Sequence, residues 1–235
     1  MICLVDERIS EKCERGLLKR GFRVIKMPGS DRLSPPVSAH PDILLFYHNN
    51  NIITSAEYCE KFPYVFSYIR EFSEASITFT SDIQEPKYPN DAIFNALAIG
   101  DCIFLKEDTV SDSIKTYAKK NGLRIISVKQ GYPACTALAF GCSAITADEG
   151  MKRALTQAGF CVTLISNGDI SLPPYEYGFI GGTAGISGKT VYFLGDVLLH
   201  RDGQKIVDAI HNEGYSYVSL SDEPLADLGR IIFVD

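Results

Sequence analysis

The sequence contains no Cys-x-x-Cys pair, no long apolar run and no surplus of positive charge. Its cysteines are odd in number and scattered, which argues against a zinc site and against a disulfide framework: Cys3, Cys13, Cys59, Cys102, Cys135, Cys142 and Cys161. Reduced thiols are typical of the cytoplasm. The first residues, MICLVDERIS, lack the basic and apolar regions of a signal peptide. We therefore expect a cytoplasmic protein.

The charge balance and the short apolar runs argue against further classes of protein, namely membrane-spanning and nucleic-acid-binding proteins. No apolar run approaches the roughly 18 residues that a membrane helix needs. Acidic residues outnumber basic ones by 29 to 23, which gives a net charge of −6. Nucleic-acid phosphates and anionic membranes both attract basic surfaces. We therefore expect no nucleic acid and no membrane among the partners, and the sequence leaves the oligomeric state open.

One pattern recurs along the chain: an amphipathic stretch, a glycine and then a β-rich run. It occurs in LLKRGFRVI (17–25), YAKKNGLRII (117–126), LTQAGFCVTLI (155–165) and IHNEGYSYVSL (210–220). Glycine suits a helix end because it enters the left-handed conformation without a steric penalty. The pattern predicts helices ending at Gly21, Gly122, Gly159 and Gly214. A capping-box pair, Thr146 and Glu149, predicts the start of the third helix.

An apolar strand repeats as well, since NALAIGDCIFL (95–105) aligns with TALAFGCSAIT (136–146) without a gap. We divide the single domain 1–235 into units 1–50, 51–101, 102–142, 143–188 and 189–235, the second being degenerate. Each unit is too small to bury its own apolar face, so we expect five ββαβ-type repeats in a ring around a central channel. This is a five-fold pseudosymmetric α/β propeller. The alternative is an open α/β sheet, whose alternating helices and strands also recur.

Five such units resemble the fold of the guanidino-group-modifying (pentein) enzymes, which include arginine deiminases, amidinotransferases and dimethylarginine hydrolases. Three segments are similar to an uncharacterised bacterial branch of this fold: YPNDAIFNALAIG (88–100), GYPACTALAF (131–140) and YGFIGGTAG (177–185). The resemblance implies that side chains from all five units converge on the channel. It implies little about the reaction, because a fold does not fix a function.

In these enzymes an early Pro-Asp motif holds the substrate guanidinium, and His40-Pro41-Asp42 resembles it. A carboxylate suits this planar cation because its two oxygens can accept two N–H groups. A second carboxylate often follows in the enzymes, whereas residues 43–51 contain none. The enzymes also end with a nucleophilic cysteine, and this chain has no cysteine after Cys161. We therefore do not expect the usual covalent mechanism at that position.

Cys135 and His40 are the candidate catalytic residues. Cys135 lies at the level of the channel in the third unit, and a reactive thiol needs a cation or a histidine beside it. His40 is the candidate acid–base group because its ordinary pKa is close to neutrality. The alternatives are an inert buried thiol for Cys135 and a surface loop for His40.

The candidate binding residues come from the other units. Asn90, Asp91 and Asn95 occupy the stretch that corresponds to Asp42, so the two aspartates are expected near one axis, where they can bind a cation. Plain turns are the alternative for both aspartates. Gly181 and Gly182 are expected to bring the backbone close to a ligand or to form a bulge. Glu176 and Asp227 are candidates at the channel mouth, with solvated loop positions as the alternative.

No metal site and no cofactor are expected. GGTAGISGKT (181–190) has the wrong glycine spacing for a P-loop, and a strand-like stretch follows it. Two functions stay open. One is binding of a small guanidino or amidino compound in the channel, with or without hydrolase or transferase activity. The other is a non-enzymatic protein-interaction module, as in the ribosome anti-association factor, which shares the pentein fold.

Overall fold

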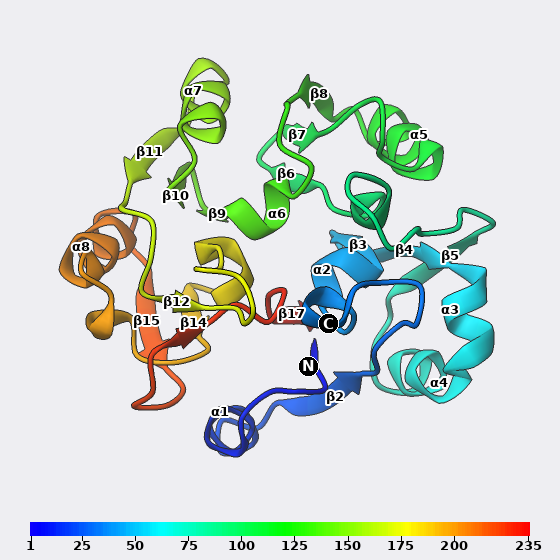
Figure 1. Ribbon diagram of the computed structural model, residues 1–235, viewed down its shortest axis with the longest axis horizontal. Helices are drawn as coiled ribbons and strands as arrows, with labels where there is room; N and C mark the ends of the chain where they lie inside the picture. The colour runs from blue at the N-terminus through cyan, green and yellow to red at the C-terminus, as the bar shows by residue number, and fades with distance from the viewer.

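Five three-stranded sheets lie around the centre of the protein, and the longer helices lie outside them (Figure 1). The computed structural model describes every residue, 1–235. The middle strand of each sheet is antiparallel to one neighbour and parallel to the other. The first sheet consists of β17 (Ile232–Val234), β1 (Ile2–Asp6) and β2 (Arg23–Met27), and the second of β3 (Leu45–His48), β4 (Asn51–Ser55) and β5 (Ser76–Thr80). The third consists of β6 (Leu97–Ile99), β7 (Cys102–Leu105) and β8 (Arg124–Ser127), and the fourth of β9 (Ala137–Phe140), β10 (Ser143–Thr146) and β11 (Cys161–Leu164). The fifth consists of β13 (Ala184–Ser187), β14 (Thr190–Phe193) and β15 (Ser216–Ser219).

A helical segment joins the two parallel strands of each sheet. These segments are α1 (Glu11–Leu18), α3 (Ala56–Lys61) followed by α4 (Pro63–Phe72), α5 (Asp112–Lys120), α7 (Glu149–Gln157) and α8 (Gly203–Asn212). The predicted glycine ends are confirmed, because Gly21, Gly122, Gly159 and Gly214 all have positive φ angles. The second unit lacks such a glycine, and there the helix is broken at Pro63 instead.

The predicted start of α7 is wrong by two residues. The cap is Asp148, whose side chain accepts a hydrogen bond from the backbone N–H of Met151 at 2.7 Å. Thr146 is still the last residue of β10, and its hydroxyl donates to the backbone oxygen of Thr136 at 2.8 Å. When two residues that can cap a helix lie so close together, the sequence alone does not show which of them caps the helix and which stays in the preceding strand.

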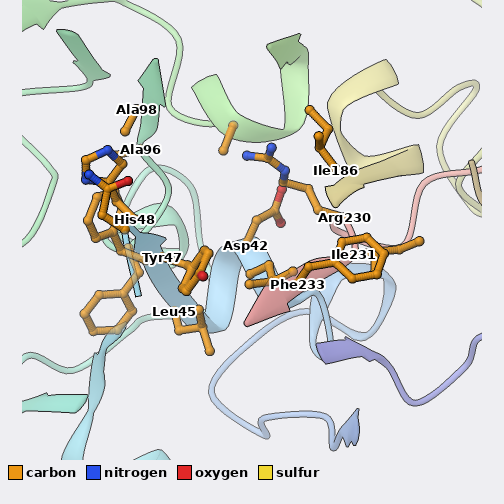
Figure 2. A pocket seen from close by; sticks show the side chains of 15 residues that line it. Asp42, Leu45, Tyr47, His48, Ala96, Ala98, Ile186, Arg230, Ile231 and Phe233 are labelled. Carbon is orange, nitrogen blue, oxygen red and sulfur yellow. The ribbon is translucent and has the colours of Figure 1, made fainter. Parts of the chain in front are cut away.

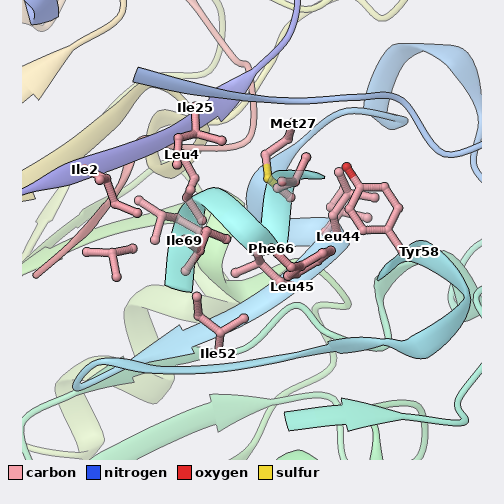
Figure 3. Packing of buried hydrophobic residues seen from close by; sticks show 14 of the residues in the cluster. Ile2, Leu4, Ile25, Met27, Leu44, Leu45, Ile52, Tyr58, Phe66 and Ile69 are labelled. Carbon is pink, nitrogen blue, oxygen red and sulfur yellow. The ribbon is translucent and has the colours of Figure 1, made fainter. Parts of the chain in front are cut away.

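Five clusters of buried hydrophobic side chains lie between neighbouring sheets, and each sheet contributes to two of them. The largest cluster holds 17 residues and lies between the first two sheets. Figure 3 shows its layers: Leu4 and Ile25 from the first sheet, Phe66 and Ile69 from α4, and Ile52 from the second sheet. Since an apolar sheet face is stable only when another layer covers it, these clusters hold the sheets beside one another.

Short helical segments carry the polar residues to the centre. α2 (Pro41–Leu44), η2 (Asn90–Ala92), α6 (Pro133–Thr136) and η3 (Ile180–Thr183) precede β3, β6, β9 and β13. Residues 227–230 hold the same place before β17. In Figure 1, α2 and α6 lie inside the circle of longer helices. Of the remaining short segments, η1 (Pro35–Val37) lies between β2 and α2, and η4 (Val197–Leu199) lies between β14 and α8.

The structure confirms a mixed α/β fold but does not join the strands into a closed barrel. Each main sheet has only three strands. The sequence did not predict a sixth sheet, in which β12 (Ile170–Ser171) pairs in parallel with β16 (Leu225–Ala226). The five-fold propeller and its repeats therefore stay predictions. None of the helices combines the length and the apolar character that crossing a membrane demands.

Candidate functional site

Three predicted site residues meet at the centre of the protein. Asp42 Oδ2 accepts a hydrogen bond from Cys135 Sγ at 3.0 Å. Asn95 Nδ2 donates to the backbone oxygen of Asp42 at 2.9 Å and lies 3.1 Å from Cys135 Sγ. Its Oδ1 accepts from the backbone N–H of Ala134 at 2.8 Å. All three side chains are buried, so Asn95 ties α2 to α6.

Burial controls the protonation of this cluster. It raises the pKa of Asp42 to about 6, although the hydrogen bond from Cys135 and the charge of Arg230 act to lower it. Burial also raises the pKa of the Cys135 thiol, and the charges of Asp42 and Asp227 add to that effect. A thiol attacks carbon as its thiolate. In this arrangement Cys135 is therefore a protonated hydrogen-bond donor at neutral pH.

A cavity of about 510 Å³ lies on one side of the cluster, and we call it the tyrosine cavity. Its aromatic lining residues are Tyr88, Tyr132, Tyr175, Tyr177 and Phe179. Its polar lining includes Cys135, His40, Glu176 and Asp227, and no lysine or arginine lines it. Glu176 is exposed at the rim, whereas Asp227 is buried. The cavity thus combines aromatic walls with negative charge.

His40 and Asp227 face each other at the buried end of the tyrosine cavity. Asp227 accepts hydrogen bonds from the backbone N–H groups of Phe179 (2.8 Å) and Gly229 (3.2 Å). His40 Nδ1 lies 4.0 Å from Asp227 Oδ1, and Nε2 lies 3.9 Å from Asp6 Oδ2. Neither ring nitrogen has a hydrogen-bond partner. Burial lowers the pKa of His40, which favours the neutral ring at pH 7.

Asp91 acts on the tyrosine cavity through Tyr132. The Tyr132 hydroxyl donates to Asp91 Oδ2 at 2.6 Å, and the Tyr132 ring centroid lies 5.4 Å from that of Tyr88. Gln84 Nε2 holds the backbone oxygen of Asp91 at 2.7 Å. Asp91 is therefore a positioning residue for the aromatic wall. Its other oxygen, Oδ1, is buried without a hydrogen-bond partner, and a cation shared with Asp42 stays a prediction.

Gly181 and Gly182 let η3 approach the centre closely. A Cβ atom on Gly182 would collide with the Asp227 carboxylate, and one on Gly181 would collide with three backbone oxygens of α6 and β9. The Gly182 oxygen accepts hydrogen bonds from the N–H groups of Leu228 (3.1 Å) and Arg230 (2.9 Å). The two glycines therefore position the segment that carries Asp227.

A second cavity, of about 250 Å³, lies beside the strands that follow the short helices. We call it the hairpin-side cavity. Figure 2 shows Asp42 and Arg230 pointing toward each other in it, with Ile231 and Phe233 nearby and Ala96 and Ala98 across the view. Asp42 lines this cavity and Cys135 lines the tyrosine cavity. Their hydrogen bond thus joins the two cavities.

The structure separates the predicted site residues into groups. Cys135, His40, Glu176 and Asp227 line the tyrosine cavity, whereas Asp42 and Asn95 contact Cys135 from the other side. Asn90 is exposed and donates to Glu85 at 2.9 Å, so it lies outside both cavities. The surface-loop alternative for His40 and the solvated alternative for Asp227 are wrong, because both side chains are buried.

Sequence reasoning missed Tyr132 and Arg230 as site residues. Tyr132 was visible beside Pro133 in GYPACT, but a tyrosine before a proline is also an ordinary loop residue. Arg230 is the only charged residue in LGRIIFV, directly before a buried strand. A lone cation at such a position is the signal that was available, since buried charges are rare.

Cys135 should react more slowly with thiol reagents than the exposed cysteines. Cys142 and Cys161 are exposed, whereas Cys135 is buried and protonated. We expect iodoacetamide at neutral pH to alkylate the two exposed cysteines first and to reach Cys135 only after denaturant is added. Peptide mass spectrometry gives the order. If Cys135 in the folded protein reacted as fast as Cys142, it would carry a thiolate, and this description of the cluster would be wrong.

No group of three His, Cys, Asp or Glu side chains is arranged to hold a metal ion. Residues 4–232 match the model of a family described as "Family of unknown function (DUF6873)". No curated protein sequence matches the chain.

Similar solved structures show the fold. A dimethylarginine dimethylaminohydrolase (DDAH) from Pseudomonas aeruginosa, complexed with citrulline, is 10% identical with a TM-score of 0.59, covering 94% of this chain and 92% of its own. An amidinotransferase of the saxitoxin biosynthetic pathway from Microseira wollei is 12% identical with a TM-score of 0.54, covering 92% and 73%. An inosamine-phosphate amidinotransferase from Streptomyces griseus is 13% identical with a TM-score of 0.50, covering 97% and 83%. The fold is that of the guanidino-group-modifying (pentein) enzymes.

Proposed function

The chain belongs to the family of unknown function DUF6873, and we propose that it binds a small guanidino or amidino compound in the tyrosine cavity. One observation carries the proposal: the cavity has aromatic walls, its charged lining residues are Asp227 and Glu176, and no lysine or arginine lines it. A cation is stabilised over the face of a tyrosine ring and by a carboxylate that accepts its N–H groups. The cavity therefore favours a planar cation.

Asp227 is the partner that we propose for the cation. Its buried carboxylate already accepts two backbone hydrogen bonds, which fix its orientation. Burial raises the pKa of Asp227, and a bound cation would favour the charged form. The neutral His40 ring lies beside it, and neither ring nitrogen has a hydrogen-bond partner. We propose that its unprotonated nitrogen accepts a further N–H from the ligand.

Turnover would require more than this ground-state arrangement. A hydrolase or transferase reaction through Cys135 first needs its thiol proton removed, and Asp42 already accepts that proton in a hydrogen bond. The other route is a water molecule that His40 activates as a general base. We propose binding as the primary function and one of these two routes as the chemistry, should turnover occur.

We further propose that the five sheets act as the five blades of a pseudosymmetric propeller in a single domain, with the two cavities at either end of its central channel. The five hydrophobic clusters between successive sheets support this arrangement. The seven free cysteines support a reducing compartment, and we propose the cytoplasm.

Titration calorimetry with agmatine, L-arginine, benzamidine and neutral citrulline tests the binding proposal. We expect at least one cation to bind, and Asp227→Asn to weaken that binding by about tenfold or more, because a charge-assisted hydrogen bond is lost. Asp208→Asn is the matched control, since Asp208 is exposed on α8. It should bind like the original protein.

Two results would count against the proposal. One is that no cation binds, which would favour the protein-interaction alternative and lead to a search for protein partners. The other is that Asp227→Asn, shown to be folded by circular dichroism, binds every cation as tightly as Asp208→Asn does.

A further inference from the structure

The hairpin-side cavity holds two buried charged groups whose hydrogen-bonding capacity is incomplete. Asp42 Oδ1 has no partner, although Oδ2 accepts from Cys135. Arg230 Nε is buried without a partner, and the charge of Asp42 acts on this guanidinium. Buried polar groups without partners are rare in folded proteins. Each of these two requires an explanation.

The backbone at Arg230 gives a second and independent observation. Its φ angle is +74°, and the other non-glycine residues with positive φ are asparagines and an aspartate, which tolerate this conformation better. The hydrogen bond from Arg230 N–H to the Gly182 oxygen holds the strained backbone in place. Strain of this kind persists where the surrounding structure enforces it, and it is concentrated at binding sites. The strain directs the Arg230 side chain into the cavity.

The rest of the lining is mostly apolar and limits the size of a ligand. Phe94, Ala134, Ile186 and Phe233 contribute apolar surface. The volume of about 250 Å³ leaves room for a small organic molecule. Such a ligand must supply an acceptor to Arg230 and a donor to Asp42, and its remaining part must be apolar.

We propose that the hairpin-side cavity binds a small apolar α-amino acid as its zwitterion, with the carboxylate on Arg230 and the ammonium group on Asp42. The net charges agree, because the Arg230–Asp42 pair and a zwitterion are both neutral overall. This site is separate from the tyrosine cavity, and Asp227 does not line it. The hydrogen bond between Asp42 and Cys135 gives a physical connection from the amino-acid site to the tyrosine cavity.

Titration calorimetry with L-alanine, L-valine, acetate and ethylammonium tests the proposal. We expect an amino acid to bind, and acetate and ethylammonium to bind about tenfold more weakly or worse, because each satisfies only one of the two charged groups. Arg230→Gln should lower amino-acid affinity by a similar factor. Arg153→Gln, an exposed arginine on α7, is the matched control. Asp227→Asn should bind the amino acid as before, which separates this site from the tyrosine cavity.

A second variant covers the case in which Arg230→Gln does not fold. Ala98→Leu places a larger side chain at the cavity wall and leaves both charged groups in position, so it should also lower amino-acid affinity. The proposal is overturned if neither amino acid binds. It is also overturned if acetate binds as tightly as alanine, which would indicate an anion site, or if Ala98→Leu leaves affinity unchanged.

Discussion

Gly181→Ala is expected to lower the free energy of unfolding by at least about 3 kcal/mol, at the upper end of the range for overpacked sites. Its Cβ would lie against the backbone oxygens of Ala134, Cys135 and Ala137, the last two at 2.6 and 2.7 Å. Backbone oxygens cannot rotate away as a side-chain end can. To make room, α6 or η3 must therefore shift. Urea unfolding measures the loss.

The control for this prediction is Gly122→Ala. Gly122 has a positive φ angle of 68° but no atom near its added Cβ, so only backbone strain of about 1–2 kcal/mol is expected. Gly181 does not have a positive φ angle, so a larger loss at Gly181 than at Gly122 would come from the steric contact at η3. Equal losses would show that η3 moves away from α6 easily, and that the central packing is looser than the structure indicates.

Asp42→Asn is expected to stabilise the protein at pH 7 and to have little effect near pH 4. The folded pKa of Asp42 is about 6, raised by burial from an ordinary 3.8. The folded state therefore holds this proton more tightly than the unfolded chain does. The stability that the proton contributes is fully present below pH 4 and is lost as pH rises toward and through 6. At pH 7 the loss amounts to about 3 kcal/mol.

An asparagine carries no such charge and can still accept the Cys135 hydrogen bond, so the variant should keep its stability across this range. Urea unfolding at several pH values between 4 and 7.5 gives the comparison, with Asp208→Asn as the exposed control. A variant less stable than the original protein at pH 7 would show that Arg230 more than compensates the buried carboxylate. A destabilising charge retained at neutral pH is typical of a functional residue.

Local patterns in the sequence predicted the helix ends because the cause is local. A glycine that ends a helix needs only its own backbone freedom, and Gly21, Gly122, Gly159 and Gly214 all adopt positive φ angles. The sheet formed by β12 and β16 was missed because each strand has only two residues. Such a strand has no periodicity of its own, and its existence depends on contacts between distant segments.

The sequence predicted which residues belong to the candidate site better than it predicted how their side chains are arranged. The repeats indicated that Asp42, Asn95 and Cys135 occupy related positions, and these residues are in contact. The sequence did not show that Cys135 would donate a hydrogen bond to Asp42, or that Tyr132 would donate one to Asp91. These facts depend on the direction in which each side chain leaves a short helix, and a rotation of one residue along that helix changes it.

The pairing of β17 with β1 affects the order in which the protein can form on the ribosome. Ile2 pairs with Val234 and Leu4 pairs with Ile232, so β1 acquires its second neighbour only when β17 has been synthesised, long after β2. Until then one edge of β1 offers unpaired N–H and C=O groups to any passing strand. Contacts between residues so far apart in sequence form slowly. A circular permutant that joins the two ends and opens the chain at Pro86–Lys87, in the exposed loop after β5, would make every three-stranded sheet from consecutive residues. It should fold with less aggregation during synthesis.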